Sequence, residues 1–142
     1  MSLKRKLIRY FCMGRHRSSV PTGLVPLSDL HSVVMYLNSP EDLQEPQKIT
    51  IGKFFKQHGM ELSFLHADDE ELRSDSDLFI SLAPKSDVNE CYAAGCSSAR
   101  FKIGRHQIKG DIYDFVVTDG TPEPAAAIDS YNVIEQFLLN IQ

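Results

Sequence analysis

Hydrophobic positions along this chain gather in short runs that polar and turn-forming residues separate. Runs rich in Val, Ile, Leu and aromatic residues predict five strands, at residues 30–37, 60–67, 77–82, 99–103 and 112–118. Ile51, Phe54 and Phe55 recur instead at helical spacing, which predicts a helix over residues 46–58. Gly59 follows that helix, in the position where a left-handed residue commonly ends one.

The stretch from Asp77 to Gly104 predicts one complete βαβ unit, in which small residues precede the second strand. Parallel strands need such a crossover, and helical crossovers belong to layered α/β proteins. A last helix is expected over residues 122–142. We therefore expect an α/β fold: a three-layer Rossmann-like sandwich of about five mostly parallel strands with helices on both faces.

Composition places the chain among ordinary globular proteins. Its 142 residues are 42% apolar and 24% charged, which is enough apolar material for one domain with a core. No apolar run approaches the ~20 residues of a membrane-spanning helix, and the basic start lacks the features of a secretory signal. Three cysteines are few and odd in number, which indicates free thiols and predicts a cytoplasmic location.

Charge divides the chain into two parts. Residues 1–25 hold six basic side chains and no acid, whereas residues 26–142 hold 9 basic and 19 acidic side chains. We interpret residues 1–25 as a basic amino-terminal helix and linker, and residues 26–142 as a single α/β domain. Residues 1–17 could contact an acidic membrane surface, but docking on the acidic domain or in a homodimer is favoured. The lack of interleaved aromatic residues argues against nucleic acid.

Known catalytic patterns are missing from the sequence. It contains no glycine-rich phosphate loop, no nucleophile elbow and no pair of histidines at metal-ligand spacing. The acidic run at residues 68–71 could bind Mg²⁺, although a solvated loop is favoured. No catalytic residue, metal ligand or cofactor is therefore predicted.

Two groups of polar residues around the fourth strand are candidate ligand contacts. Ser97 and Ser98, beside Cys96, could line a pocket, and the alternative is that small residues allow close packing of helix and sheet. Arg100 and Lys102 alternate with apolar residues, which predicts an edge or half-exposed strand. They could receive a phosphate or carboxylate, or they could protect an edge strand from aggregation.

The carboxyl ends of the strands are the expected place for a ligand. Asn38, Asp68, Pro84 and Gly104 follow predicted strands and would gather there, so Asn38 is a further candidate ligand residue. Gly104 is expected to allow positive φ or close backbone approach.

Two stretches resemble known families. The segment 98–104, Ser-Ala-Arg-Phe-Lys-Ile-Gly, and Tyr113-Asp114 resemble an uncharacterised family of small cytoplasmic Bacteroidetes proteins, over residues 28–142. That resemblance implies no activity and no catalytic residues. More weakly, segments 77–82 and 99–104 are similar to the amino-terminal half of lipopolysaccharide heptosyltransferases. Those enzymes need a second Rossmann-like domain, for which 142 residues leave no room, so the similarity implies the fold and not the reaction.

The favoured function is a non-catalytic module that binds a small anionic ligand or a protein partner. Two alternatives stay open: an enzyme subunit that a partner chain completes, and a peripheral-membrane or scaffold protein that uses the basic amino-terminal helix.

Overall fold

A computed structural model describes residues 27–85, 87–108, 110–117 and 126–140 of the chain. The predictions for the basic arm, and for the beginning of the last helix near Pro122, lie outside these residues. The described elements are η1 (Leu27–Asp29), β1 (Ser32–Leu37), η2 (Pro40–Asp42), α2 (Glu45–Gln57), β2 (Glu61–His66), β3 (Leu78–Ser81), α3 (Val88–Cys96), β4 (Phe101–Gly104), β5 (Phe115–Val116) and α4 (Ala127–Asn140). None of the described helices is long and apolar enough to cross a membrane.

The five strands form one parallel sheet in the order β2-β1-β3-β4-β5. This is one of the two common strand orders of doubly wound α/β proteins. The chain moves from β1 to β2 on one side and then returns to β3 on the other side. The carboxyl ends of β1 and β3 therefore diverge at a topological switch point, where ligands bind in such sheets.

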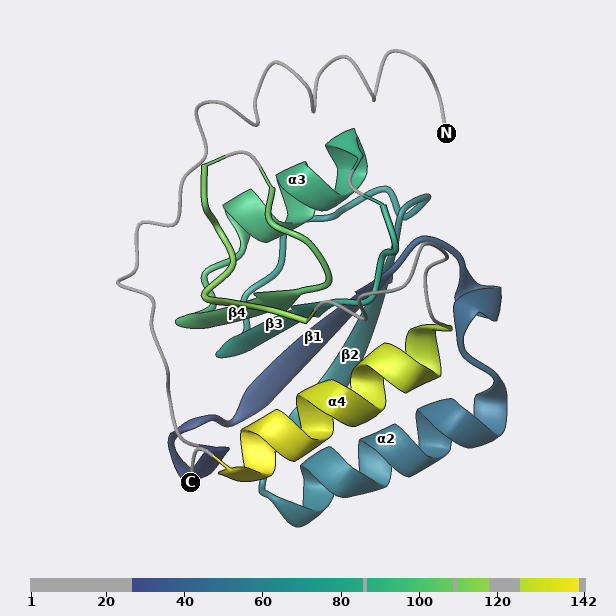
Figure 1. Ribbon diagram of the computed structural model, residues 1–142, viewed down its shortest axis with the longest axis vertical. Helices are drawn as coiled ribbons and strands as arrows, with labels where there is room; N and C mark the ends of the chain where they lie inside the picture. The colour runs from purple at the N-terminus through teal and green to yellow at the C-terminus, as the bar shows by residue number, and fades with distance from the viewer. Residues whose placement is uncertain (1–26, 86, 109, 118–125, 141–142) are drawn as a thin grey trace.

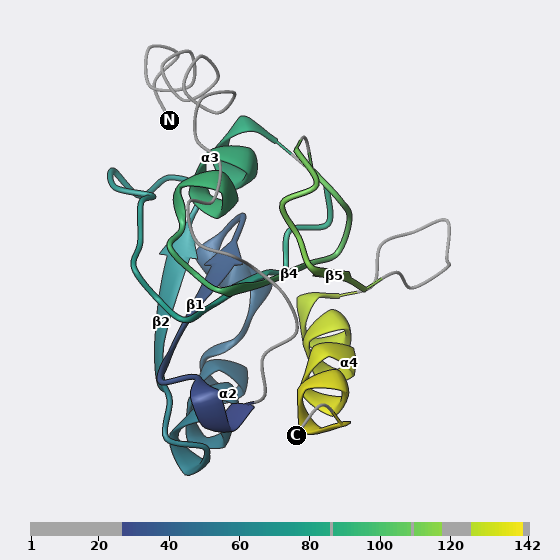
Figure 2. The ribbon, with the colours of Figure 1, turned by 90° about the vertical axis from the view of Figure 1, so that its left-hand side faces the viewer.

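Helices cover both faces of the sheet, which confirms the predicted three-layer α/β architecture. Helices α2 and α4 lie together on one face, and α3 lies on the other (Figures 1 and 2). Side chains of β1 alternate between the two layers, as a pleated strand requires. Val33, Met35 and Leu37 join the core under α2 and α4, whereas Val34 and Tyr36 join the core under α3.

Local sequence signals account for the ends of α2. Pro46 lies in its first turn, where the missing N–H costs nothing. Gly59 adopts φ 75° directly after the cap, which confirms its predicted role as a left-handed terminator.

The fifth strand, predicted over residues 112–118, is shorter than expected, because of the described residues 112–117 only Phe115–Val116 pairs in the sheet. The side chain of Gln107 takes the place of a ladder partner at Tyr113. Its Nε2 donates to the Tyr113 carbonyl at 2.9 Å, and its Oε1 accepts from the Tyr113 N–H at 3.0 Å. The segment before β5 is therefore held as a loop.

The predicted edge position of the fourth strand is wrong. Strand β4 pairs with β3 on one side and with β5 on the other. Lys102 is fully buried on the α3 face, and Arg100 is exposed just before the strand begins. Neither residue protects a free edge.

Candidate functional site

A cavity of about 320 Å³ lies at the switch point between β1 and β3. It is lined by Asn38, Asp42, Leu82, Pro84, Arg105, Ala126 and Ala127. These residues come from the segments after β1, β3 and β4 and from the beginning of α4. The position follows from the strand order, because the carboxyl ends of parallel strands meet at one edge of the sheet.

Asn38 is held at this cavity by the turn that follows β1. The backbone N–H of Ser39 donates to Asp42 Oδ2 at 3.1 Å, and the N–H of Glu41 donates to Ser39 Oγ at 3.4 Å. These bonds cap the short helix η2 and fix the preceding residue. Asn38 Oδ1 is buried and has no hydrogen-bond partner among the described residues. An unsatisfied buried acceptor costs about 1–3 kcal/mol, which a ligand's donor group would recover.

Arg105 brings positive charge to the same cavity. It follows β4 directly, and its Nη1 donates to the Leu82 carbonyl at 3.1 Å. This bond holds the half-buried guanidinium across the end of β3. A guanidinium carries five N–H donors in a planar fork that suits carboxylate and phosphate groups.

The first turn of α4 supplies the remaining wall. Ala126 and Ala127 line the cavity at the point where the 14-residue helix begins. The first N–H groups of a helix lack intrahelical acceptors and carry partial positive charge. The cavity therefore has an electropositive part, formed by Arg105 and the helix end, and an acceptor part, formed by Asn38 and Asp42.

Other predicted ligand residues lie at the opposite side of the sheet, where the amino ends of the strands are. Ser97, Ser98 and Arg100 precede β4, so they lie at its amino end, whereas Asn38 follows the carboxyl end of β1. Ser97 Oγ accepts from the Ala99 N–H at 3.1 Å, and Arg100 Nη2 donates to the Asp29 carbonyl at 3.1 Å. The structure therefore does not bring these residues together with Asn38.

Lys102 has a structural contact in place of the predicted ligand. Its Nζ donates to the Ala94 carbonyl at 2.8 Å, one of the last carbonyls of α3. A cation is favourable at a helix carboxyl terminus, so this side chain satisfies the buried helix end. Burial lowers the pKa of Lys102 to about 8, against an opposing effect of the Asp114 carboxylate.

A buried polar cluster on the α3 face was missed at the level of sequence. The carboxylate of Glu90, fully buried in the first turn of α3, accepts from Tyr113 Oη at 2.5 Å. Its other oxygen lies 3.0 Å from His106 Nε2. The hydrogen bond to Glu90 raises the pKa of His106 while burial opposes it, and burial raises the pKa of Tyr113 well above its usual value.

The Glu90 carboxylate orients the ring of His106, and the thiol of Cys96 lies at the other end of α3. Glu90 is in the first turn of α3 and Cys96 is its last residue. Six residues of helix separate them by about 9 Å along the axis. His106 therefore does not activate Cys96. The described part of the chain also contains no group of three His, Cys, Asp or Glu residues placed to hold a metal ion.

Comparisons with protein-family models, with curated proteins and with solved structures find no match for this chain. The two resemblances noted in the sequence therefore stay predictions, and the geometry of the site is the basis for inferring a function.

Proposed function

We propose that this chain is a Rossmann-like binding module that holds a small anionic ligand at the carboxyl edge of its sheet, without catalysing a reaction. One observation carries the proposal. Arg105, the amino terminus of α4 and Asn38, whose amide oxygen is buried and unpartnered among the described residues, line one cavity at the switch point. Cavities at this point of α/β sheets commonly bind ligands.

The two parts of the cavity define the chemistry of the ligand. Its anionic group, a phosphate or carboxylate, lies against Arg105 and the first turn of α4. Its hydroxyl or ammonium donors face Asn38 Oδ1 and the carboxylate of Asp42. A volume of about 320 Å³ is near the lower limit for small-molecule pockets, which favours a ligand the size of a sugar phosphate.

The Glu90–His106 pair favours one alternative, an enzyme subunit whose remaining groups come from a partner chain. A histidine held by a buried carboxylate is a common arrangement for proton transfer. The side chain of His106 is 24% exposed, so a partner could reach its ring. A cytoplasmic location is part of either proposal, since Cys91 and Cys96 form no disulfide with each other.

Thermal-shift measurements with inorganic phosphate, sugar phosphates, nucleoside phosphates and small carboxylates test the proposal. A ligand at 100 times its dissociation constant adds about 2.7 kcal/mol of stability. Arg105→Ala should abolish the shift. Arg100→Ala is the matched control, because it removes an exposed guanidinium at the opposite edge of the sheet. Silence across the whole panel, or a shift that Arg105→Ala retains, would contradict the proposed site.

A further inference from the structure

Strand β2 forms one edge of the sheet and has an open side. It pairs in parallel with β1, and the N–H groups of Glu61 and Ala67 donate to the carbonyls of His31 and Leu37 at 3.0 and 3.1 Å. Alternate residues of a parallel strand direct their backbone groups to opposite sides. The N–H and C=O groups of Leu62 and Phe64 therefore face away from β1, where no described strand pairs with them.

At His66, two residues after Phe64, a hydrogen bond within the chain satisfies the outward-facing N–H. The N–H of His66 donates to Asp69 Oδ2 at 2.9 Å, so the turn after β2 satisfies that position. Among the residues that the structure describes, the unpaired part of the edge is thus confined to Leu62 and Phe64. Such an edge accepts an additional extended strand through main-chain hydrogen bonds.

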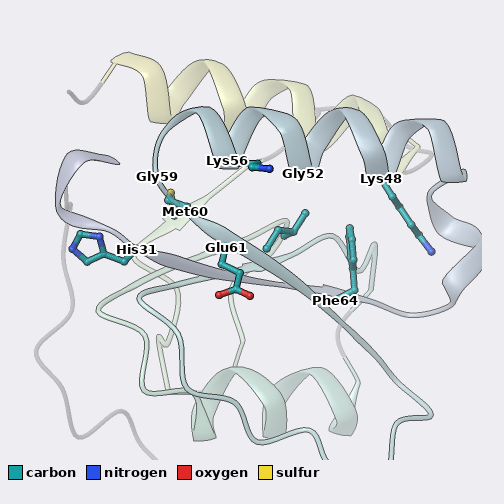
Figure 3. A pocket seen from close by; sticks show the side chains of 9 residues that line it. His31, Lys48, Gly52, Lys56, Gly59, Met60, Glu61 and Phe64 are labelled. Atoms are coloured by element: carbon teal, nitrogen blue, oxygen red, sulfur yellow. The ribbon is translucent and has the colours of Figure 1, made fainter.

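A groove of about 660 Å³ runs beside this edge, between β2 and α2. Figure 3 shows Lys48, Gly52 and Lys56 along the helix above it and Phe64 directed up toward the helix from the strand below. Leu62 and Phe64 are half-buried and form its apolar floor. A strand added to β2 would place alternate side chains into this groove.

Gly52 is a second, independent indication that the groove is used. It lies in the interior of α2, where glycine weakens a helix relative to alanine. A Cβ at this position would meet nothing within 4 Å, so no packing contact in the described chain requires glycine. A side chain there would instead narrow the groove.

The charges around the groove indicate which kind of segment could bind in it. Lys48, Lys56 and His31 line the groove, and Glu61 is its one carboxylate, which points away from α2 in Figure 3. Lys48 Nζ lies 3.7 Å from Glu45 Oε1, whose side chain is exposed, and 5.6 Å from the centre of the Phe64 ring. This distribution repels the chain's own arm, residues 1–25, with its six basic side chains.

We infer that this groove docks an extended acidic segment of a partner protein. The segment adds to the β2 edge as a further strand, places apolar side chains on Leu62 and Phe64, and directs carboxylates to Lys48 and Lys56. This surface is separate from the switch-point cavity and does not depend on the function proposed there.

The test uses the isotope-labelled full chain and two synthetic peptides, one alternating Glu with Val and one alternating Lys with Val. The acidic peptide should shift the amide resonances of Leu62 and Phe64 and slow their hydrogen exchange. The basic peptide should do neither. Equal binding of both peptides, or no change at β2 with the acidic one, would overturn the inference.

Variants separate the groove from the general charge of the helix. Replacing Lys48 and Lys56 with Glu should weaken the acidic peptide about tenfold or more. Lys53→Glu is the matched control, because Lys53 lies on α2 outside the groove. Gly52→Ala should raise the melting temperature and still weaken binding. Unchanged binding in this more stable variant would contradict docking beneath α2.

Two other results would replace the proposed occupant. Sedimentation velocity would show a dimer that Gly52→Ala dissociates if a second copy fills the groove. A peptide of residues 1–25 that binds more tightly than the acidic peptide would identify the chain's own arm as the occupant.

Discussion

The two faces of the sheet solve the same packing problem with different chemistry. Under α2 and α4 the core is built from aliphatic and aromatic side chains, among them Phe55, Phe101 and Ile134. Under α3 the core includes Glu90 and Lys102, which are both fully buried. The difference shows where secondary structure alone satisfies the backbone and where side chains must do so.

The irregular connections explain the polar face. Two helices cover the first face, and their interior backbone groups bond within each helix. On the second face α3 is accompanied by loops, whose backbone groups need other partners. Gln107 binds the backbone of Tyr113, Asp114 Oδ2 accepts from the Lys102 N–H at 2.9 Å, and Lys102 binds the end of α3. Polar side chains therefore take over backbone hydrogen bonds where regular structure is missing.

The largest effect is expected on the apolar face. Phe101→Ala would leave a cavity beside Phe137, whose ring centre lies 6.2 Å from that of Phe101. The loss should be about 3–5 kcal/mol of unfolding free energy. Urea denaturation should give the same loss at acidic and at alkaline pH, since no charge is removed. A loss of unfolding free energy that changes with pH would contradict the contrast between the apolar and the polar face of the sheet.

Gly104→Val should cost nearly as much on the polar face. A Cβ at Gly104 would lie 2.3 Å from Tyr113 Cε2, so the ring must move and its hydroxyl must leave Glu90. Overpacking of this kind costs up to about 3 kcal/mol. The expected close approach at this glycine is confirmed, without positive φ. Gly52→Ala is the control, and a melting temperature for Gly104→Val equal to wild type would contradict the packing argument.

Lys102→Met should expose the cost of a buried cation. The folded pKa of about 8 lies below the unfolded value of 10.5, so the unfolded chain binds more protons between them. Wild type should therefore gain stability relative to Lys102→Met as pH rises through this window, by about 2–3 kcal/mol. Urea denaturation at both ends of the window measures the difference. If the unfolding free energies of the two proteins changed equally with pH, the assigned pKa shift of Lys102 would be contradicted.

The smallest effect should come from His106→Gln. The pKa of His106 is raised in the folded chain, so its ion pair with Glu90 stabilises the fold fully below the ordinary value of 6.5. That contribution is lost as pH rises through the folded pKa. The unfolding free energy of the wild type, measured by urea denaturation, should exceed that of His106→Gln most at pH below 6.5. His31→Gln, at an exposed histidine, is the control. A difference that grows with pH would reverse the assigned sign.

The architecture could be predicted from the sequence because it depends on local runs. Apolar runs predict the strands, and the spacing of Ile51, Phe54 and Phe55 predicts a helix. Each of these signals comes from residues that are close together in the sequence. The fate of Lys102 could not be predicted in this way. Its alternation with apolar neighbours is typical of a half-exposed strand, and only the approach of α3 buries it.

The candidate site was predictable only in part. Asn38 could be chosen because it follows a strand, and Arg105 has the same property after β4. Bringing them together requires the strand order, which depends on long-range pairing. Glu90 has the sequence signature of an exposed first-turn acid, three residues after the Asp87 cap. Its burial depends on His106 and Tyr113, which are 16 and 23 residues away.

The all-parallel sheet has a consequence for the speed of folding. The described strands include no hairpin, so every pairing must wait until a long loop closes. The bond from the Asp77 N–H to Ser32 Oγ, beside the central pair β1 and β3, joins residues 45 positions apart. Topologies of this kind fold slowly for their size, which leaves the central strands exposed to other chains during synthesis.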